Sequence, residues 1–559
     1  CFGGVAASID AAGRRAYMKS CAKNAPNILL ITADQLRWDY VHAYEVHDFI
    51  QTPALDSLAR DGCLCERAYS PNPVCIPARH NLITGLPARF HGFDDNYFGA
   101  DAKACPWDLP TFAQILSDHG YDTAAIGKMH FQPERRCTGF DLFENCDEIV
   151  RDIAEDEYAQ FLRDNGYPTL GSLHGVRNAL YMQPQQSLVP EEFHSSSWIA
   201  DRSIAYLKSR ATRSAPFLLW TGFIHPHPPL DVPEGWAHRY DGRLPKHTSS
   251  VTPLSKLAEE NKCIADLPDE ENINRMRELY ACAVTFMDHN VGKILRALDE
   301  EGLAENTLVL FVSDHGEMLG DLDTYQKFLA YDPSCRIPML LRWPGRIPAG
   351  SRRRDFTDLN DILPTILDAA GVEYPGAYPL PGESLLTDHP VKNRSVQYVE
   401  HQRGSKRWCC CINERYKYVH FYGDADQLFD LKADPEERID LLHGTPSAEI
   451  CAVREEMYGI LVEYERRWGL PGYIKNGGFV SYPPYQIQRY QESCFPSMMI
   501  REPGAPPLTD LAEEILQAIK HEPTVHLDKL HIEGLLTQVG GMSKEEFQQL
   551  LTRAAAQGN

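Results

Sequence analysis

Long hydrophobic runs are missing from this sequence. NILLIT at 27–32 and FLLW at 217–220 are among its longest apolar stretches, whereas a helix that crosses a bilayer needs about 18–20 consecutive apolar residues. We therefore expect no transmembrane segment.

An excess of basic residues is missing as well. The chain carries 55 Lys and Arg against 78 Asp and Glu, a formal net charge of −23. Non-specific binding of nucleic acids depends on basic surfaces that neutralise phosphates, so we expect no nucleic-acid partner. Because an acidic surface repels anions, chemistry on an anionic substrate would need a locally positive pocket.

Cysteine spacings typical of zinc sites are also absent. None of the 16 cysteines forms a C-x-x-C pair, and only CLC at 63–65 and CCC at 409–411 cluster. Adjacent cysteines are poor disulfide partners, so WCCCI is expected to be a reduced strand. Cysteines in these positions favour a reducing compartment.

The N-terminus allows two interpretations. The segment that starts at Met18 resembles a cytoplasmic start without an apolar signal region, and we expect a cytoplasmic protein. The alternative is a periplasmic or lipid-anchored protein in which Cys1 carries the lipid.

With 559 residues, the chain is long enough for two domains or for one large α/β domain with an appendage. Strand-like apolar runs are predicted at 27–32, 123–127, 217–224, 307–313 and 338–343. Helical patterns lie between them at 52–62, 109–120, 195–210 and 273–302. Continuous apolar strands are typical of a mostly parallel sheet sandwiched by helices, which is the α/β fold class. The stretches 132–192 and 228–270 are predicted to be long loops that cap a site.

After residue 395 the pattern changes to short strands separated by turns. They predict a small antiparallel sheet with the helix 447–469 packed on it. A loop-rich tail follows and ends in two short helices, the second of which opens with a capping box from Ser543 to Glu546. The expected units are an N-terminal extension (1–24), a catalytic α/β domain (25–394), a C-terminal subdomain (395–505) and a helical tail (506–559). The tail is a candidate element for assembly into a homo-oligomer.

Polar residues follow four of the predicted strands directly. In a parallel sheet the carboxyl ends of the strands share one edge, where ligands bind. The residues expected to meet there are Asp34, Gln35, Lys128, His130, His225, His227, Asp314 and His315. Their oxygen and nitrogen donors suit a divalent cation such as calcium, magnesium or manganese, and the cationic members suit an anionic ester. The alternative is that each is a separately solvated loop residue.

The segment NPVCIPARHNLITG at 72–85 places Cys75 at the start of a predicted helix, because Pro77 suits a first helical turn. One hypothesis is a buried structural cysteine. Another is a thiolate nucleophile, since a helix N-terminus favours negative charge. A tyrosine-phosphatase arrangement is excluded, because Asn81 occupies the position where that site needs an arginine.

A third hypothesis comes from a resemblance. C-I-P-A-R followed by I-T-G resembles the sulfatase signature C-x-P-x-R with a later Thr-Gly, in which the cysteine is converted to formylglycine. Further segments resemble that family in the family's order, over about residues 25–440. They are NILLITADQ, GYDTAAIGKMHF, GFIHPHPPL, FVSDHGEMLGD, K-x3-Y-x4-R-x-P from Lys327, DILPTILDAAG and QLFDLKADPEE.

The resemblance implies an alkaline-phosphatase-like fold and a set of site residues. The implied metal ligands, for one divalent cation with Ca²⁺ preferred and Mn²⁺ or Mg²⁺ as alternatives, are Asp34, Gln35, Cys75, Asp314 and His315. The implied catalytic residues are Cys75, Arg79, Lys128, His130, His227 (rather than His225) and Lys327. The hydrate of modified Cys75 would attack the sulfur of a sulfate monoester, and its second hydroxyl would then release sulfate. A formylglycine-generating maturation enzyme is the implied partner.

The sequence departs from the family pattern in three places. Ala78 replaces the usual serine of the signature, which bears on the maturation enzyme that accepts the site, and Leu322 replaces a usual histidine of the pocket. The pairs Asp34-Gln35 and Asp314-His315 are similar to those of phosphonate monoester hydrolases and their arylsulfatase relatives, which leaves both the metal and the ester open. We therefore expect a sulfatase acting on a small sulfated sugar or aryl sulfate. A phosphonate monoester or phosphodiester hydrolase is the first alternative, and a catalytically silent anion-binding protein with unmodified Cys75 is the second.

Overall fold

The structure is a computed structural model that describes most of the chain. The described residues are 25–96, 105–106, 109–135, 138–150, 152–262, 269–386, 394–487, 511–525 and 543–556. The predictions for Cys1 and for the extension 1–24 lie outside them.

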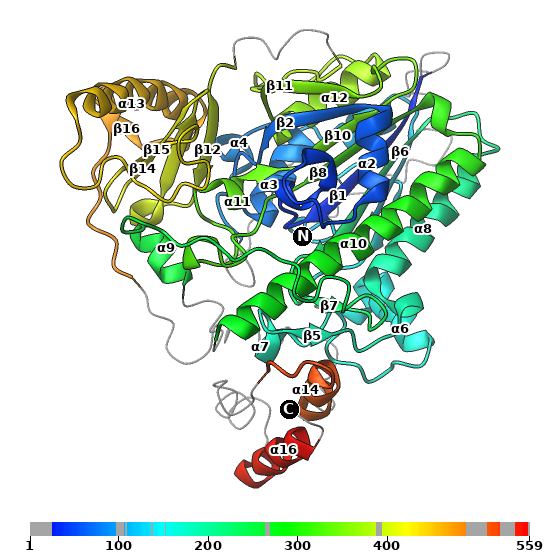
Figure 1. Ribbon diagram of the computed structural model, residues 1–559. Coiled ribbons are helices and arrows are strands. Elements are labelled where there is room, and N and C mark those ends of the chain that lie inside the picture. Colours follow the sequence, from blue (N-terminus) through cyan, green and yellow to red (C-terminus); the bar gives the residue numbers. More distant parts are fainter. Residues whose placement is uncertain are drawn as a thin grey trace, which may run out of the picture.

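A nine-stranded sheet forms the centre of the molecule (Figure 1). Its strand order is β11-β2-β10-β8-β1-β6-β3-β4, and β9 pairs with β2. The bounds are β1 (Asn27–Asp34), β2 (Cys63–Tyr69), β3 (Asp122–Gly127), β4 (Leu142–Asn145), β6 (Phe217–Pro226), β8 (Thr307–Ser313), β9 (Arg336–Ile337), β10 (Met339–Arg342) and β11 (Ser351–Asp358). The predicted α/β class and mostly parallel sheet are confirmed. Strands β9 and β10 pair in the antiparallel direction.

Helices cover both faces of this sheet, as the continuous apolar strands predicted. Leu29 and Ile31 of β1 pack toward α2 (Pro53–Asp61), α8 (Ser195–Arg210) and α10 (Glu270–Glu300). The alternate residues Ile28 and Leu30 pack toward α3 (Cys75–Thr84), α5 (Phe112–Asp118) and α12 (Ile362–Ala370). The helices predicted at 52–62, 109–120, 195–210 and 273–302 correspond to α2, α5, α8 and α10.

Four strands of the central sheet, β2, β4, β9 and β11, and several short elements were not predicted. Strand β11 is an edge strand whose first half alternates between exposed and partly buried residues, so it lacks a continuous apolar run. The prediction of two long loops is wrong in part. The first stretch holds β4, α6 (Glu157–Asp164), α7 (Arg177–Leu180) and β5 (Gln185–Gln186), and the second holds β7 (Asp231–Val232) and α9 (Lys256–Asn261). Strands β5 and β7 pair with each other and join the two stretches.

The small antiparallel sheet is confirmed. It consists of β12 (Gln397–His401), β13 (Trp408–Ile412), β14 (Tyr416–Phe421) and β15 (Gln427–Asp430), with α13 (Ala448–Trp468) packed on it. The cysteines 409–411 of β13 are buried free thiols, in agreement with the predicted reduced strand. Other short elements are α4 (Ala88–His91), α11 (Asp332–Cys335), β16 (Ile474–Lys475), β17 (Gly478–Phe479) and several single-turn 3-10 helices.

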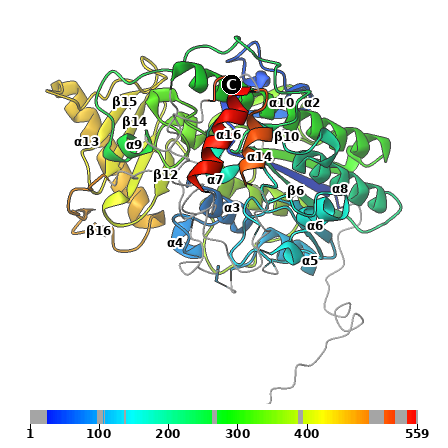
Figure 2. The ribbon, with the colours of Figure 1, turned by 90° about the horizontal axis from the view of Figure 1, so that it is seen from below.

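The tail contains α14 (Leu511–Ile519) and α16 (Lys544–Ala556). Both predicted bonds of the capping box are present, between Ser543 and Glu546. Figures 1 and 2 both place α14 beside α7, and side chains of the two helices share one apolar cluster. The tail therefore packs against the segment around α7, which comes before β6 in the chain.

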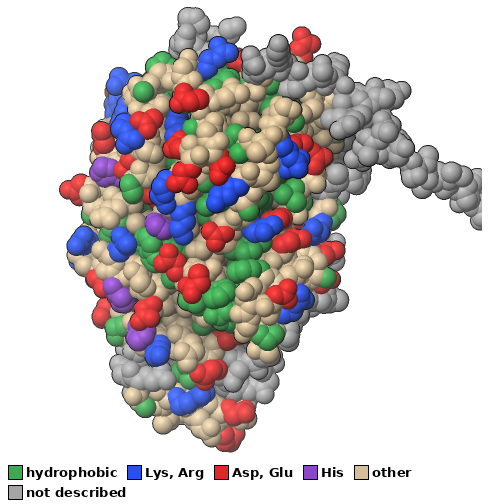
Figure 3. Space-filling model, turned by 90° about the vertical axis from the view of Figure 1, so that its right-hand side faces the viewer, with side chains coloured by type: hydrophobic (Ala, Val, Ile, Leu, Met, Phe, Trp, Pro, Cys, Tyr) green, Lys and Arg blue, Asp and Glu red, His purple; other side chains and the backbone are tan. Residues whose placement is uncertain are grey.

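Among the helices of the described residues, none has the length and apolar character needed to cross a membrane. The face drawn in Figure 3 mixes acidic and basic side chains. On that face the net negative charge is not gathered into one patch.

Candidate active site

The register of the sheet brings the four polar clusters to one edge. Ala33 of β1 lies opposite Ser313 of β8, and Asp34 lies opposite Pro226 of β6. Strand β3 ends beside β6, where a Cβ atom on Gly222 would lie 2.2 Å from the carbonyl oxygen of Lys128. Glycine is therefore required for this close approach.

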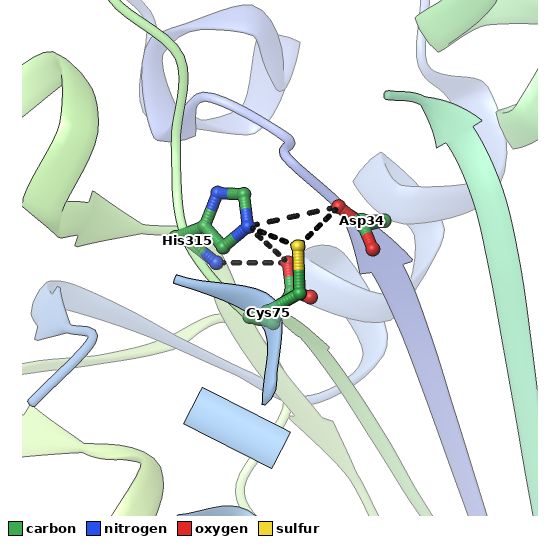
Figure 4. A group of neighbouring side chains, drawn as sticks. Asp34, Cys75 and His315 are labelled. Atoms are coloured by element: carbon green, nitrogen blue, oxygen red, sulfur yellow. Dashed lines mark hydrogen bonds and ion pairs between the residues drawn. The ribbon is translucent and has the colours of Figure 1, made fainter. Parts of the chain in front are cut away.

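Cys75 is the first residue of α3 and is completely buried. Its Sγ lies 3.2 Å from His315 Nε2 and 3.8 Å from Asp34 Oδ1 (Figure 4). Burial and the charge of Asp34 raise the pKa of the thiol to about 12. A thiol with this pKa stays protonated at neutral pH, which counts against the thiolate hypothesis.

Arg79 lies one helical turn after Cys75 and is completely buried. Its Nε donates to Asp314 Oδ2 at 3.0 Å and its Nη2 donates to Asp34 Oδ2 at 3.2 Å. Its Nη1 donates to the carbonyl oxygen of Lys128 at 2.6 Å. The planar guanidinium therefore fixes three strand ends at once.

The two carboxylates beside Cys75 are held ionised. Burial opposes the charge on Asp34, but the cations Lys128 and Arg79 outweigh it, and its pKa is lowered. Burial likewise opposes the charge on Asp314, but His315 and Arg79 lower its pKa to about 2. Ionised oxygens are therefore available to a cation at neutral pH.

Four predicted ligands form one compact group. Ligand atoms of Asp34, Cys75, Asp314 and His315 all lie within 4.8 Å of one another. Nε2 of His315 lies 3.7 Å from an oxygen of each carboxylate. Donors bound to one calcium at about 2.3–2.6 Å are themselves about 3.3–3.7 Å apart in octahedral geometry, so the donor set fits a divalent cation.

Gln35, the fifth predicted ligand, lies beside this group. Its backbone N–H donates to Asp314 Oδ1 at 3.1 Å, and its side-chain oxygen accepts from Lys327 Nζ at 2.7 Å. Its amide nitrogen contacts Glu317, a buried carboxyl in the same cluster. Gln35 thus links the candidate ligands to Lys327.

Lys327 and His227 lie on the other side of Cys75. Lys327 Nζ is 3.3 Å from Cys75 Sγ and 2.8 Å from His227 Nε2. His227 Nδ1 donates to the carbonyl oxygen of Pro228, so Nε2 is the nitrogen that accepts from Lys327. Burial lowers the pKa of His227 well below its usual value, which keeps the ring neutral.

Lys128 and His130 follow β3 into the same region. Lys128 Nζ lies 2.5 Å from Asp34 Oδ2. His130 is buried, and burial together with the charge of Lys128 lowers its pKa well below its usual value. The structure therefore gathers Lys128 with the other predicted residues and leaves the role of His130 a prediction.

His225 belongs to a different group, which supports the choice of His227 on geometric grounds. His225 Nε2 lies 3.0 Å from Asp231 Oδ1, and His194 Nε2 lies 3.5 Å from Asp231 Oδ2. His194 Nδ1 accepts the backbone N–H of Ser196, so its proton is on Nε2. These three side chains therefore form a separate group beside the β6–β7 connection.

Sequence reasoning missed three charged residues of the site, the buried Glu317 and Glu148 and the partly buried Arg177. Glu317 follows His315 closely and could have been found in the segment DHGE. Glu148 contacts both Lys128 and Arg177, and its Oε1 lies 3.4 Å from His227 Nε2. No sequence pattern marked Glu148 or Arg177, because both belong to the stretch predicted to be a loop.

Comparisons with known proteins find family models that match most of the chain. A family model described as Sulfatase matches residues 26–372. A second model, described as N-sulphoglucosamine sulphohydrolase, C-terminal, matches residues 320–463. Together these matches include every predicted site residue and the small antiparallel sheet.

Individual relatives are similar over most of their length. An arylsulfatase of Clostridium perfringens is 31% identical over 442 residues, which cover 75% of this chain and 90% of that protein. The multifunctional alkaline phosphatase superfamily protein PehA of Trinickia caryophylli is 29% identical over 471 residues, covering 74% and 90%. The crystal structure of a phosphonate monoester hydrolase of Agrobacterium radiobacter has a TM-score of 0.70 at 25% identity, covering 82% of this chain and all of that chain.

Proposed function

Because the chain belongs to the sulfatase family, and is thereby a sulfuric ester hydrolase, we propose that it cleaves sulfate monoesters with a formylglycine derived from Cys75. The expected substrates are small sulfated sugars or aryl sulfates. The expected partner is a maturation enzyme that oxidises the cysteine.

One observation carries this proposal. Side chain 75 lies between a candidate cation group, represented by Asp34 and His315, and the ammonium of Lys327. An oxygen nucleophile at this position would meet positive charge on both sides. Burial and the charge of Asp34 raise the pKa of an unmodified thiol at this position, which disfavours a thiolate nucleophile.

The proposed cation is calcium, with manganese and magnesium as alternatives. The residues that would hold it are Asp34, Gln35, Asp314, His315 and side chain 75. The ion would supply Lewis-acid stabilisation of negative charge. Arg79 would keep both carboxylates oriented toward it through its fork of donors.

The cations around Cys75 have separate roles in the proposal. The hydrate at position 75 would supply the attacking hydroxyl and the hydroxyl that later releases sulfate. Lys128 and Lys327 would bind the non-bridging oxygens of the ester. His227, whose Nε2 lies 2.8 Å from Lys327 Nζ, would assist the departing alcohol. His130 would orient or deprotonate the second hydroxyl.

The nucleophile is tested by mass and by turnover. Intact-protein mass spectrometry of natively matured protein should show a loss of about 18 Da at residue 75, as expected for oxidation of the thiol to an aldehyde. The Cys75→Ala variant should lose all hydrolysis of 4-nitrophenyl sulfate, while Cys451→Ala, at an exposed cysteine, should keep it. Full activity in Cys75→Ala would overturn the assignment. An unmodified thiol in natively matured protein would favour the silent anion-binding alternative.

A second candidate is hydrolysis of phosphonate monoesters or phosphodiesters. It is favoured by the pairs Asp34-Gln35 and Asp314-His315 and by the similarity to a phosphonate monoester hydrolase. Parallel measurement of kcat/KM on 4-nitrophenyl sulfate and on 4-nitrophenyl phenylphosphonate decides between the two. A higher value for the phosphonate would move the assignment to this class.

A further inference from the structure

Glu148 is a buried carboxylate in the middle of the site's cations, and the mechanism above gives it no role. It contacts Lys128 through one oxygen and Arg177 through the other. His227 Nε2 lies 3.4 Å away. Ligand atoms of Glu148, His227 and Cys75 lie within 4.8 Å of one another.

This carboxylate stands where the ester is expected to bind. The proposed function assigns Lys128 to the ester oxygens, and Glu148 pairs with the ammonium of Lys128 in the absence of substrate. Its other neighbour, His227 Nε2, carries no proton, because the proton of that ring is on Nδ1. An ester oxygen that binds Lys128 therefore comes to lie beside this carboxylate and competes with it for the ammonium. Glu148 then retains its partner Arg177 and remains at the edge of the site.

Arg177 is fixed independently of the substrate. Its Nη1 lies 3.5 Å from the carbonyl oxygen of Pro228, and its guanidinium lies 4.7 Å from the ring centre of Tyr181. It begins α7, whose inner side packs on the tail helix α14. The other partner of the carboxylate, Arg177, is therefore held in place.

We propose that Glu148 is a specificity-determining residue that restricts this site to esters carrying a single negative charge. Sulfate monoesters, phosphonate monoesters and phosphodiesters are monoanions at neutral pH, whereas phosphate monoesters are dianions at pH 8. A second negative charge on the ester would face the carboxylate across a few ångströms of buried space, where repulsion between like charges is strong. This inference rests on the proposed function, because it places the ester on Lys128 and His227.

The test compares natively matured wild-type protein with Glu148→Gln. The ratio of kcat/KM for 4-nitrophenyl phosphate to kcat/KM for 4-nitrophenyl sulfate at pH 8 should rise about tenfold or more in the variant. Glu144→Gln is the matched control, since Glu144 lies four residues earlier and pairs with Arg202 on the surface. The control should leave the ratio unchanged.

Two further measurements keep the test decisive. Glu148→Asp keeps the charge and should keep the low ratio, whereas Glu148→Ala removes it and should raise the ratio as Gln does. Calorimetric titration with inorganic sulfate, a dianion, should give a Kd about tenfold lower for Glu148→Gln than for wild type. An unchanged or lower ratio, or unchanged sulfate affinity, would overturn the role of Glu148. Failure of the wild type to hydrolyse 4-nitrophenyl sulfate would instead overturn the proposed function, and the sulfate titration would still decide the role of Glu148.

Discussion

At the scale of single residues, Arg79 shows how much of this site depends on one side chain. Its guanidinium joins two carboxylates and one backbone carbonyl in a fully buried setting. Lysine has the same charge but one donor group, which cannot reach these partners in the same directions. The residue is therefore specified by shape as much as by charge.

We expect Arg79→Lys to lose stability and activity together. Breaking a buried ion pair costs about 3–5 kcal/mol, and the freed carboxylates would no longer be oriented toward a cation. Thermal unfolding and calcium titration followed by calorimetry measure both effects. Arg202→Lys, at a surface pair with Glu144, should change the melting temperature by little. An Arg79→Lys variant with wild-type stability and cation affinity would contradict this prediction.

A second prediction for a single residue concerns Gly222. A Cβ at this position would meet a backbone oxygen at 2.2 Å, which a side-chain rotation cannot relieve. Gly222→Ala should therefore push β3 away from β6, destabilise the fold by about 1–3 kcal/mol and displace Lys128. Urea unfolding and kcat/KM for 4-nitrophenyl sulfate report the two effects. Gly235→Ala, where nothing lies within 4 Å of the added carbon, is the control and should leave both values unchanged.

The sequence predicted the residues at the strand ends because a parallel sheet fixes where they meet. Asp34 and Asp314 follow continuous apolar runs, and those runs become neighbours through burial on both faces. Glu148 could not be predicted in this way. It reaches Lys128 through a segment whose course depends on tertiary contacts that no local pattern encodes.

At the scale of elements, burial decides which strands could be predicted from the sequence, as β8 and β11 show. Strand β8 is buried along its whole length and was predicted from its composition. Strand β11 lies at the sheet edge, and its charged first half has one exposed side. The tail helices were predicted as helices, but their packing against α7 was not predicted. This packing depends on an apolar face of α7, and a helix of four residues is too short for such a face to be recognised in the sequence.

We expect Leu516→Ala to loosen the tail and weaken substrate binding. Leu516 is buried in the cluster that joins α14 to Leu180 of α7. Loss of a buried leucine costs about 2–5 kcal/mol, and the freed α7 would hold Arg177 less firmly. Limited proteolysis should cut the tail faster, and KM for 4-nitrophenyl sulfate should rise more than kcat falls. Gln517→Ala on the exposed side of α14 is the control, and equal proteolysis of both variants would contradict the prediction.

At the scale of the whole molecule, buried acids make stability depend on pH. Asp288 of α10 accepts the backbone N–H groups of Ala54 and Leu55 at the start of α2. Burial raises the pKa of Asp288 to about 7 from 3.8. The folded state therefore holds a proton that the unfolded state has lost between these two values, and stability falls as pH rises from about 4 to 7.

Asp288→Asn tests this linkage, because it removes the titrating carboxyl. The two N–H groups bond different carboxylate oxygens, so the amide keeps one acceptor and loses the other, and this loss is the same at every pH. Relative to wild type, the variant should gain about 2–4 kcal/mol of unfolding free energy between pH 4 and pH 8. Denaturant unfolding at pH 4, 6 and 8 measures the difference. Asp201→Asn, at an exposed position on α8, should show no such trend. A pH-independent difference between Asp288→Asn and wild type would show that this carboxyl is ionised in the folded state.

The packing of α14 on α7 forms late during synthesis, because α14 lies near the C-terminal end of the described residues. The ribosome delivers every proposed site residue, from Asp34 to Lys327, before it delivers α14. Until then the apolar side of α7 has no cover from this helix, since Val176 and Leu180 pack against Ile515 and Leu516. A nascent chain would thus hold every proposed site residue before α14 had covered the helix that begins with Arg177.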